Sequence, residues 1–432
     1  MLNNDVKFPK EALAVLKRLN ENGYDAYIVG GAVRDALTGR PLQDVDIATD
    51  ARTEDVRRVF SPIAKVVETG VKHGTVTVVF GGSHYEITTF RSDGSYSDAR
   101  HPDSVRFIGD IAEDLKRRDF TVNAMAYSEK SGVIDFFDGK GDIQKKILRA
   151  VGDPEARLKE DSLRILRAVR FSSQLGFTVE ANTLEAMKNN VRSLSGLSAE
   201  RIFAELTRRL CGKYRYKALK NYAFFIFYVL PELQAEYMCD QMNLSHRFDV
   251  YDHTVYALKQ CKVFTPEVSW ALLLHDSGKP YTITYGTDCQ RHFPDHWSVS
   301  EKIADKVLTR LKAPNELKNE VRFLCLYHDD YFRGGKPTIK RFLSKYGEKY
   351  MKDLCTVKRA DWLAHSDFGV KRYEKAFNAF CGDLDEVLNS GDCYRISDLE
   401  VDGDDIVALG FSGKAIGDVL RRVLDKVIDG EL

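Results

Sequence analysis

The chain has 432 residues, more than one hydrophobic core usually serves, so we expect two to four domains. Hydrophobic residues make up 44% of the chain and charged residues 30%, which is ordinary for a globular protein. Lys plus Arg equals Asp plus Glu at 64 each, so the charge balance excludes a uniformly basic or acidic chain and directs the search for a nucleic-acid site to local clusters.

Two features bear on the compartment. No apolar run is long enough to span a membrane, and the first residues lack the apolar region of a signal peptide, so we expect a cytoplasmic protein without a membrane partner. The eight cysteines lie far apart and form no CxxC pair. This spacing predicts reduced thiols rather than disulfides or zinc ligands.

The periodicity of the apolar residues changes along the chain. Residues 1 to about 150 alternate helical patterns with β-rich runs such as TVTVVFGG and SHYEITTF, which predicts a small α/β head with a mixed sheet. Turn-forming residues fill 92–104 and predict a mobile loop. From about residue 151 onward, apolar residues recur every three and four positions, which predicts a helical remainder, and the last segment indicates two helices around a Gly-rich turn. The fold class is therefore α+β.

The stretch 28–50, IVGGAVRDALTGRPLQDVDIATD, is the most informative. Gly30 and Gly31 open a predicted helix, whose amino end and close-lying backbone N–H groups favour a bound triphosphate. Asp44 and Asp46 lie one residue apart on an apolar run, and side chains at i and i+2 of a strand point to the same face. Either half alone is more often a simple turn or cap. Together they predict a magnesium site beside a phosphate cradle, the arrangement that nucleotidyl transfer needs.

Six strings in this region and beyond it carry a family resemblance. They are GGAVRD (30–35), DVDIAT (44–49), YEITTFR (85–91), RRDFTVNAMAY (117–127), DFFDGKGDI (135–143) and EDSLRILRAVRF (160–171). With these strings in this order, the chain resembles the bacterial class II tRNA nucleotidyltransferases, the CCA-adding enzymes, and their poly(A) polymerase relatives. The resemblance implies a polymerase-β-like nucleotidyltransferase head, Mg²⁺ as cofactor, and tRNA, CTP and ATP as partners.

The same resemblance suggests four domains. We expect a nucleotidyltransferase head over 1–150, a helical neck with a nucleotide-selecting motif and a basic strip over 151–220, a helical body over 221–390, and an RNA-binding helical tail over 391–432.

Within the head, Asp44 and Asp46 are the first-choice metal ligands, and Glu86 is the candidate for a third carboxylate, although a cross-strand partner for Arg91 is an alternative role for it. Asp119 and Asn123 are one helical turn apart, a spacing that would put them on one face. The resemblance gives this segment the nucleotide sugar and triphosphate. The remaining expected nucleotide-binding residues of the head are Gly30, Gly31, Arg34 and Arg118; Arg117 and Arg118 together fit a surface salt-bridge cluster as well.

Asp161 and Arg164 would be i and i+3 neighbours on a helix, holding a carboxylate acceptor and a guanidinium donor side by side. This pair matches the Watson–Crick edges of cytosine and adenine, whereas uracil and guanine present the reverse polarity. The matching EDxxR motif of the family selects C and A in this way, without a nucleic-acid template. An intrahelical salt bridge is the alternative. Arg167, a turn further on, is expected to touch the triphosphate or to hold Asp161.

A basic strip follows at 201–220, with Tyr214 and Tyr216 interleaved. Such a strip could follow an RNA backbone while the aromatic rings meet exposed bases, and a solvated helix face is the alternative. The expected RNA-binding residues are Arg201, Arg208, Arg209, Lys213, Arg215, Lys217 and Lys220.

A second group of candidate metal ligands, made of histidines and aspartates, lies in the helical body. It resembles the HD phosphohydrolase superfamily, in which imidazoles and carboxylates bind one or two divalent ions that activate water; Mn²⁺ or Ni²⁺ are candidate ions. Asp295 stands where that pattern commonly has glycine, and His292 competes with His296 as a ligand. Isolated histidines are more often core residues, which is the alternative. The expected ligands are His253, His275, Asp276, His296, His328 and Asp361.

Three functions follow. The first is template-independent addition of CCA to tRNA, with a possible HD phosphohydrolase activity; the second is poly(A) synthesis or A-only addition. The third, from another class, is a metal-dependent HD phosphohydrolase whose head only binds RNA. Intact Asp44, Asp46, Asp161 and Arg164 favour the first over the third.

Overall fold

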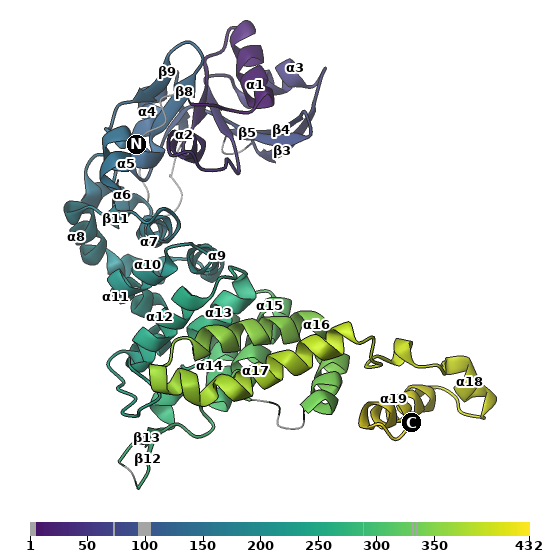
Figure 1. The fold of residues 1–432 in the computed structure, drawn as a ribbon. Coiled ribbons are helices and arrows are strands. Elements are labelled where there is room, and N and C mark those ends of the chain that lie inside the picture. Colours follow the sequence, from purple (N-terminus) through teal and green to yellow (C-terminus); the bar gives the residue numbers. More distant parts are fainter. Residues whose placement is uncertain (1–5, 72–73, 94–104, 288, 331, 333–334) are drawn as a thin grey trace. The chain divides into compact units, whose positions relative to one another are not determined.

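In a computed structural model the chain forms two compact units, residues 1–205 and 206–432 (Figure 1). The structure describes all residues except 1–5, 72–73, 94–104, 288, 331 and 333–334. The α+β class is confirmed, because the first unit is built on a sheet and the second is mainly helical. Among the described residues, every helix is too short or too polar to cross a lipid bilayer.

The sheet of the first unit has seven strands in the order β3-β4-β5-β2-β1-β8-β9, and of its pairings only β2 with β5 is parallel. Successive buried residues of the central strands point to opposite faces of the sheet. Ile28 and Ile47 fill one face, while Val29 and Ala48 join Phe90 in the other. A sheet that is covered on both sides needs such nearly continuous apolar strands. The strands are β1 (Ala26–Val29), β2 (Asp46–Thr49), β3 (Lys65–Gly70), β4 (Thr75–Phe80), β5 (Ser83–Thr89), β8 (Met125–Ser128) and β9 (Gly132–Asp135).

Short helices connect and cover these strands. Gly30 precedes the second helix with a φ of +73°, a left-handed value that glycine adopts without strain. A Cβ at this position would lie 2.8 Å from Nη1 of Arg118. The helices of the head are α1 (Lys10–Glu21), α2 (Gly31–Leu37), α3 (Thr53–Phe60), α4 (Ile111–Lys116) and α5 (Gly139–Lys145), with a 3-10 turn η2 (Thr121–Asn123).

Helices predominate after the head. They are α6 (Pro154–Glu160), α7 (Leu163–Leu175), α8 (Ala181–Asn189), η3 (Val191–Gly196) and α9 (Ala199–Leu210), followed by α10 (Arg215–Asn221), α11 (Ala223–Val229), η4 (Pro231–Glu236), α12 (Val250–Gln260), α13 (Pro266–Leu274), η5 (Lys279–Tyr281), α14 (His296–Arg310), α15 (Asn315–Tyr327), α16 (Gly335–Trp362), α17 (Asp367–Asn389), η6 (Ile396–Asp398), α18 (Gly403–Ala408) and α19 (Lys414–Asp429). The last two confirm the pair of helices predicted at the end of the chain.

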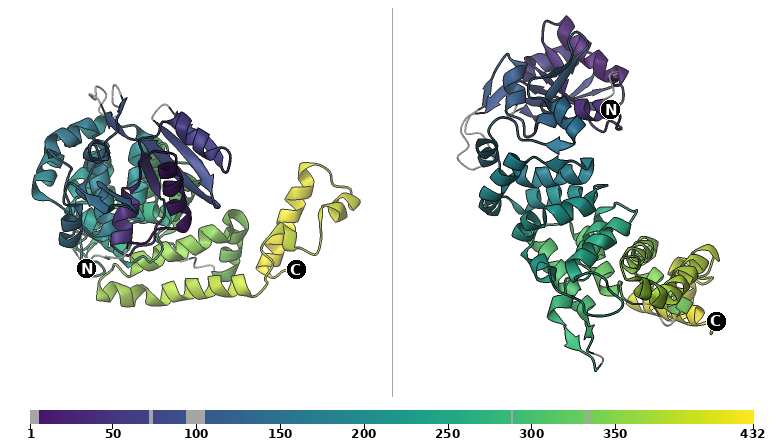
Figure 2. Two further views of the ribbon diagram at one scale, coloured as in Figure 1. Left: turned by 90° about the horizontal axis from the view of Figure 1, so that it is seen from above. Right: turned by 60° about the vertical axis from the view of Figure 1, so that its left-hand side comes forward.

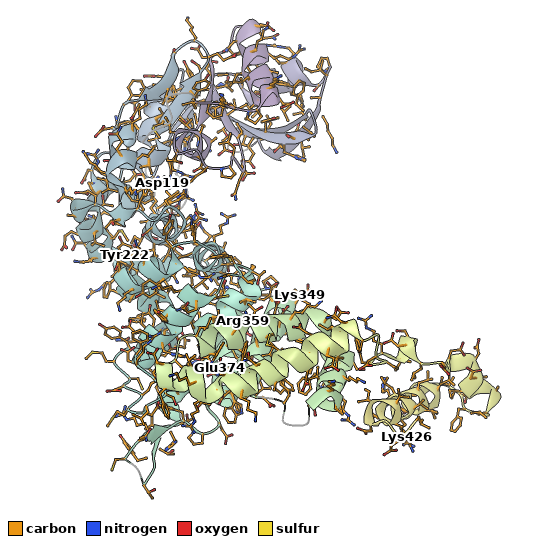
Figure 3. All side chains as sticks on the ribbon, viewed as in Figure 1. Asp119, Tyr222, Lys349, Arg359, Glu374 and Lys426 are labelled. Atoms are coloured by element: carbon orange, nitrogen blue, oxygen red, sulfur yellow. A yellow bond between two sulfur atoms is a disulfide. The ribbon has the colours of Figure 1, made fainter. Side chains whose placement is uncertain are left out.

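The longest helices, α16 and α17, lie side by side in the second unit, as Figure 2 also shows. The first of them is interrupted at Gly347, where φ is +83°. Beyond this break, Lys349, labelled in Figure 3, forms an ion pair with the buried carboxylate of Glu320 on α15 at 2.5 Å. The pairing of Trp362 with Phe377, stacked at 4.8 Å between centroids, joins α16 to α17.

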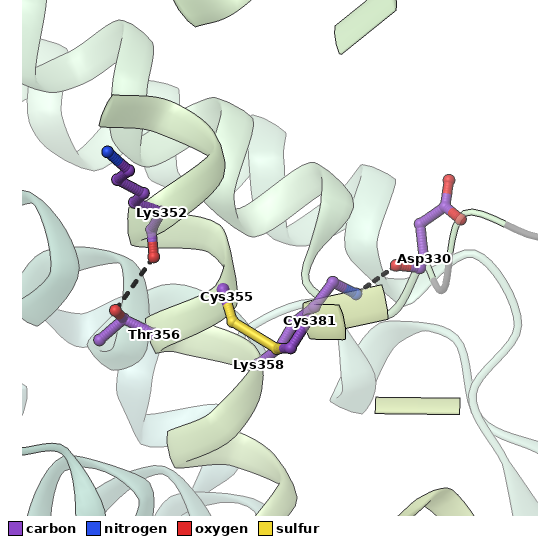
Figure 4. Close-up of a disulfide and its surroundings, with 6 residues drawn as sticks. All are labelled: Asp330, Lys352, Cys355, Thr356, Lys358 and Cys381. Carbon is purple, nitrogen blue, oxygen red and sulfur yellow. Dashed lines mark hydrogen bonds between the residues drawn. A yellow bond between two sulfur atoms is a disulfide. The ribbon is translucent and has the colours of Figure 1, made fainter. Parts of the chain in front are cut away.

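Three sequence-based expectations were wrong in part. Cys355 and Cys381 form a disulfide, because neighbouring helices bring their Cα atoms within 6.4 Å although 26 residues separate them (Figure 4). The predicted helical remainder also contains short strands: β11 (Thr178–Val179) pairs with β10 (Ile147–Leu148) at the end of the head, and β12 (Thr284–Tyr285) pairs with β13 (Arg291–His292). The predicted loop begins in a strand, because β6 (Arg91–Asp93) pairs with β7 (Val105–Phe107); residues 94–104 lie outside the described part.

Candidate active site and metal centre

Asp46 and Glu86 lie on neighbouring strands that run in parallel. The register pairs Ile47 with Ile87, and the same offset places Asp46 beside Glu86 on the same face. Asp44 is two residues earlier, just before β2 rather than within it. A hollow of about 600 Å³ is lined by Asp44, Val45, Asp46, Val67, Thr77, His84 and Glu86. The expected third carboxylate therefore shares the hollow with the first two.

The electrostatics of this hollow suit a cation. Partial desolvation raises the pKa of Asp46, the Arg118 guanidinium opposes this rise, and Glu86 and Asp44 add to it. Carboxylates that raise each other's pKa are relieved by a bound positive ion, and oxygen ligands are those that Mg²⁺ prefers. The side chains present therefore fit a divalent metal.

A separate polar network joins Arg34, Asn123, Asp119 and Arg167. Arg34, which is buried, donates to Asn123 Oδ1, and Asn123 Nδ2 donates to Asp119 Oδ1 at 3.1 Å. Arg167 Nη2 lies 2.6 Å from Asp119 Oδ2. Burial opposes ionisation of Asp119, but Arg167 and Asn123 lower its pKa to about 2. The predicted contact of Asp119 with Asn123 is confirmed, although the 3-10 turn η2 creates it and not an α-helix.

The expected phosphate-binding site differs from the sequence-based prediction in two respects. The first is the backbone N–H of Gly30, and the second is the ion pairing of Arg117 and Arg118. The N–H of Gly30 donates to Met125 O at 3.1 Å, because β1 continues its pairing with β8 to this point. It is therefore engaged in the sheet and not free for a phosphate. Arg117 and Arg118 both contact the buried carboxylate of Asp114, at 2.8 and 3.4 Å, which is the alternative salt-bridge arrangement. A phosphate would meet Arg118 already oriented by this carboxylate.

The geometry expected for Asp161 and Arg164 was wrong. Asp161 is the C-cap of α6 with extended backbone, and α7 starts only at Leu163, so one helix does not carry both side chains. Asp161 instead pairs with Arg201 of α9 at 2.8 Å. Arg164 donates to the carbonyl of Arg117 at 3.0 Å and contacts the carboxylate of Glu160 at 2.6 Å. Both groups are thus ordered, each by a partner that was not expected.

The basic strip is not one continuous surface. Arg209 and Arg215 are each only 1% exposed, because α9 and α10 turn these positions toward the core. Arg215 donates to the carbonyls of Leu258 and Cys261, at 2.8 and 2.7 Å, and so stabilises the C-terminal end of α12. These two arginines are corrected from RNA-binding to structural residues. The exposed members of the strip are Arg208, Lys213, Lys217 and Lys220, of which Lys220 pairs with Asp252 at 3.1 Å.

In the second unit, all six residues expected at the HD-type site meet. They come from five helices or helix ends: His253 from α12, His275 and Asp276 after α13, His296 at the start of α14, His328 at the end of α15 and Asp361 from α16. The competing His292 is exposed on β13 and lines the same cavity of about 380 Å³ without joining the cluster.

The two oxygens of Asp276 divide the cluster into halves. Around Oδ2 lie Nε2 of His275 at 3.4 Å and Nε2 of His253 at 3.6 Å, and Asp361 Oδ1 is 2.8 Å from the latter nitrogen. Around Oδ1 lie Nε2 of His296 and His328, at 3.4 and 3.6 Å. Each half gathers three or four metal-ligating atoms.

Hydrogen bonds to backbone carbonyls orient three of these histidines. Nδ1 of His275, His296 and His328 lies 2.7 to 2.9 Å from a backbone carbonyl, which leaves Nε2 facing Asp276. Asp276 Oδ1 and Nε2 of His275 are buried without a well-aligned hydrogen bond among the described residues, whereas Asp276 Oδ2 lies 2.7 Å from the ammonium of Lys279. Buried polar atoms normally have partners, so this convergence fits a metal ion.

The backbone at Gly278 and Asp295 explains how the turn after α13 comes close to the start of α14. A Cβ at Gly278 would lie 2.2 Å from the carbonyl oxygen of His296, so only glycine lets the turn after Asp276 reach the start of α14. Asp295 has a φ of +54°, which accounts for the glycine commonly found there; aspartate tolerates this region better than most residues.

Sequence reasoning missed three residues beside this cluster. Lys279 Nζ is 2.7 Å from Asp276 Oδ2, and a Lys three residues after Asp276 was a usable signal. His246 and His365 join His253 as a further group of converging imidazoles; the position of His365 four residues after Asp361 was a usable signal, whereas His246 has no comparable one.

Comparisons with known proteins identify two regions of the chain, the second of which extends from the first unit into the second. Residues 26–149 match the model of the "Poly A polymerase head domain", and residues 176–235 match that of the "Probable RNA and SrmB- binding site of polymerase A". Fold and site therefore define a nucleotidyltransferase of the poly(A) polymerase type, a class that requires a divalent metal.

Relatives narrow the class. A CCA-adding enzyme of Streptococcus suis is 32% identical over 443 residues, covering 100% of this chain and 95% of the relative. One of Lactobacillus delbrueckii subsp. bulgaricus is 50% identical over 212 residues, but that match spans only about half of either protein, 49% of this chain and 53% of the relative. The crystal structure of a Bacillus stearothermophilus CCA-adding enzyme in complex with CTP has a TM-score of 0.70 at 30% identity, covering 98% of this chain and 93% of that one. The chain belongs to the family of CCA-adding enzymes.

Proposed function

We propose that this protein adds CCA to the 3′ end of tRNA from CTP and ATP, without a template, and does so in the cytoplasm. The observation that carries the proposal is the convergence of Asp44, Asp46 and Glu86 from adjacent strands in one hollow. The similar Bacillus stearothermophilus structure contains CTP, which supports a nucleotide substrate for this fold. The four domains outlined from the sequence remain part of the proposal.

Each group has a task in this reaction. Asp44, Asp46 and Glu86 would hold the metal, which we take to be Mg²⁺. When bound, it would polarise the primer 3′ hydroxyl and offset the charge of departing pyrophosphate. Arg118 and the amino end of α2 would bind the triphosphate. Asp161 and Arg164 would read the base by exchanging their present partners for its Watson–Crick edge.

The test offers tRNA that lacks its 3′ end to the purified chain, with each NTP alone and with CTP plus ATP. We expect two C and one A to be added and UTP and GTP to be refused. Continued addition of A would indicate a poly(A) polymerase, and addition of A only to tRNA already ending in CC would indicate an A-adding enzyme. No incorporation from any NTP would refute the proposal.

We infer a second candidate function, metal-dependent phosphoester hydrolysis, from the cluster around Asp276. Arg291 and Arg372 line the same cavity and would offer positive charge to a phosphate. With Mn²⁺ or Ni²⁺, the chain should hydrolyse a 2′,3′-cyclic phosphate, and the double variant His275→Ala with Asp276→Ala should stop this. An absence of hydrolysis over a panel of cyclic and terminal phosphates would leave the cluster without this activity.

A further inference from the structure

The C-terminal end of α15 is fixed by a buried lysine of α16. Lys358 is 2% exposed, and its Nζ donates to the carbonyl of His328 at 2.7 Å. It also donates to the carbonyl of Asp330, as Figure 4 shows. The Lys358 ammonium therefore stabilises the turn that directly follows α15.

This position is one where a buried ammonium can be stable. Burying an unpaired charge costs several kcal/mol, but the last carbonyls of a helix carry the negative end of its dipole. The ring centroids of Phe332 and Phe380 lie 5.8 and 5.5 Å from Nζ, close enough for cation–π attraction. These rings stack on each other at 5.1 Å, so the surroundings of Lys358 join three segments of the unit.

The residue held in this way belongs to the metal cluster. His328 is anchored twice, through its carbonyl by Lys358 and through Nδ1 by the Cys325 carbonyl at 2.7 Å. Its Nε2 then lies 3.2 Å from Nε2 of His296 and 3.6 Å from Asp276 Oδ1. Among the residues that the structure describes, the half of the cluster around Oδ1 has these three ligands, so a shift of His328 removes a third of them.

We propose that Lys358 is a positioning residue for this three-ligand half and sets the affinity of a second divalent cation there. The inference rests on the metal cluster described under the proposed function and goes beyond it, because it assigns a role to a residue outside the ligand set. The half around Asp276 Oδ2, with His253, His275 and Asp361, does not depend on the contact with the His328 carbonyl.

The test compares the full chain with Lys358→Met, which keeps the length of the side chain without its charge. Every protein in the test, including the one called wild type below, also carries Asp46→Ala, so that the carboxylate hollow of the first unit contributes no Mn²⁺ to the count. Lys352→Met is the matched control, because Lys352 lies on the same helix, is exposed, and pairs with Glu348 at 3.0 Å. Mn²⁺ binding is followed by calorimetry, and electron paramagnetic resonance of the loaded proteins reports whether two ions are close enough to couple.

We expect two ions with coupled spectra in the wild type and in Lys352→Met. In Lys358→Met, one ion should remain with its affinity kept, the other should bind at least 10-fold more weakly, and the spectrum should become that of an isolated ion. If Lys358→Met does not fold, Lys358→Arg serves, which keeps the charge with a different reach and should weaken only the second ion.

Two coupled ions of unchanged affinity in the Lys358 variants would overturn the proposal, as would equal weakening of both ions or a wild type that binds a single ion. Absence of any ion from the wild type would instead refute the metal cluster itself, so the two failures can be told apart.

Discussion

Asp161 and Arg164 hold partners that an incoming base would have to replace. Asp161 forms an ion pair with Arg201, and Arg164 forms an ion pair with Glu160. Exchange of one ion pair for hydrogen bonds to a base is favourable only when donors and acceptors match, because an unmatched buried polar group is costly. Selection of C and A would therefore arise from the mismatch that U and G create at this pair.

We predict that Asp161→Ala or Arg164→Ala lowers discrimination against UTP and GTP more than it slows turnover with CTP. Loss of half of a paired readout should cost about 1–3 kcal/mol of selectivity, by analogy with bidentate base contacts. Single-turnover incorporation of each NTP measures the ratio, with the exposed Lys159→Ala of α6 as control. Unaltered preference for CTP and ATP in both variants would make the two residues structural.

Asp119 gives a prediction for acid stability. Its pKa is lowered from 3.8 to about 2 in the folded protein, so the folded state favours the carboxylate. This contribution, about 2 kcal/mol, is present above pH 3.8 and is lost as the pH falls toward 2. Denaturant unfolding should show Asp119→Asn less stable than wild type at pH 6, with a smaller difference at pH 3. A difference that grows as the pH falls would contradict the assignment.

At the scale of elements, the pair α16 and α17 is joined by stacked rings and by the disulfide of Cys355 and Cys381. Disulfides are uncommon in the cytoplasm, which we propose as the compartment, so the ring contacts must suffice there when the thiols are reduced. The bond closes a loop between positions 26 residues apart.

We therefore predict that oxidised protein is more stable than reduced protein by about 3 kcal/mol, and that Cys355→Ser abolishes this difference. Denaturant unfolding with and without a thiol reductant measures both. Wild type that unfolds at the same denaturant concentration in either buffer would show that the bond does not contribute.

Those parts of the two sites that depend on the spacing of residues within one strand or helix could be predicted from the sequence. The proximity of Asp44 and Asp46 could be predicted from their close spacing, and the HD-type ligands could be collected because they stand in five helical segments, with His275 and Asp276 adjacent after one of them. Contacts that depend on tertiary packing could not be predicted. Arg201 reaches Asp161 across 40 residues, and Lys358 reaches the His328 carbonyl from another helix.

The dependence on tertiary packing also explains why the prediction for the basic strip at 201–220 was wrong in part. A count of basic residues over 201–220 does not distinguish a side chain that points outward from one that is buried. Arg209 and Arg215 fall on the core side of α9 and α10, where Arg215 stabilises carbonyls at the end of α12. Exposure, and not composition, decides which residues of the strip can meet RNA.

At the scale of the whole molecule, two different metal chemistries are assigned to two compact units. The carboxylate hollow belongs to residues 1–205, and the histidine cluster belongs to residues 206–432. Oxygen ligands favour Mg²⁺, whereas imidazole suits transition metals, so each unit should load its own ion. We expect the two activities to respond to different substitutions.

The measurement that tests the central claim most directly is extension of one tRNA that lacks its 3′ end, with CTP and ATP, by three proteins. These are the wild type, Asp46→Ala, and the double variant His275→Ala with Asp276→Ala, and the added nucleotides are identified by sequencing. The account predicts CCA from the wild type and from the double variant, and no addition by Asp46→Ala although it still binds tRNA. Incorporation near the wild-type rate by Asp46→Ala would contradict the account.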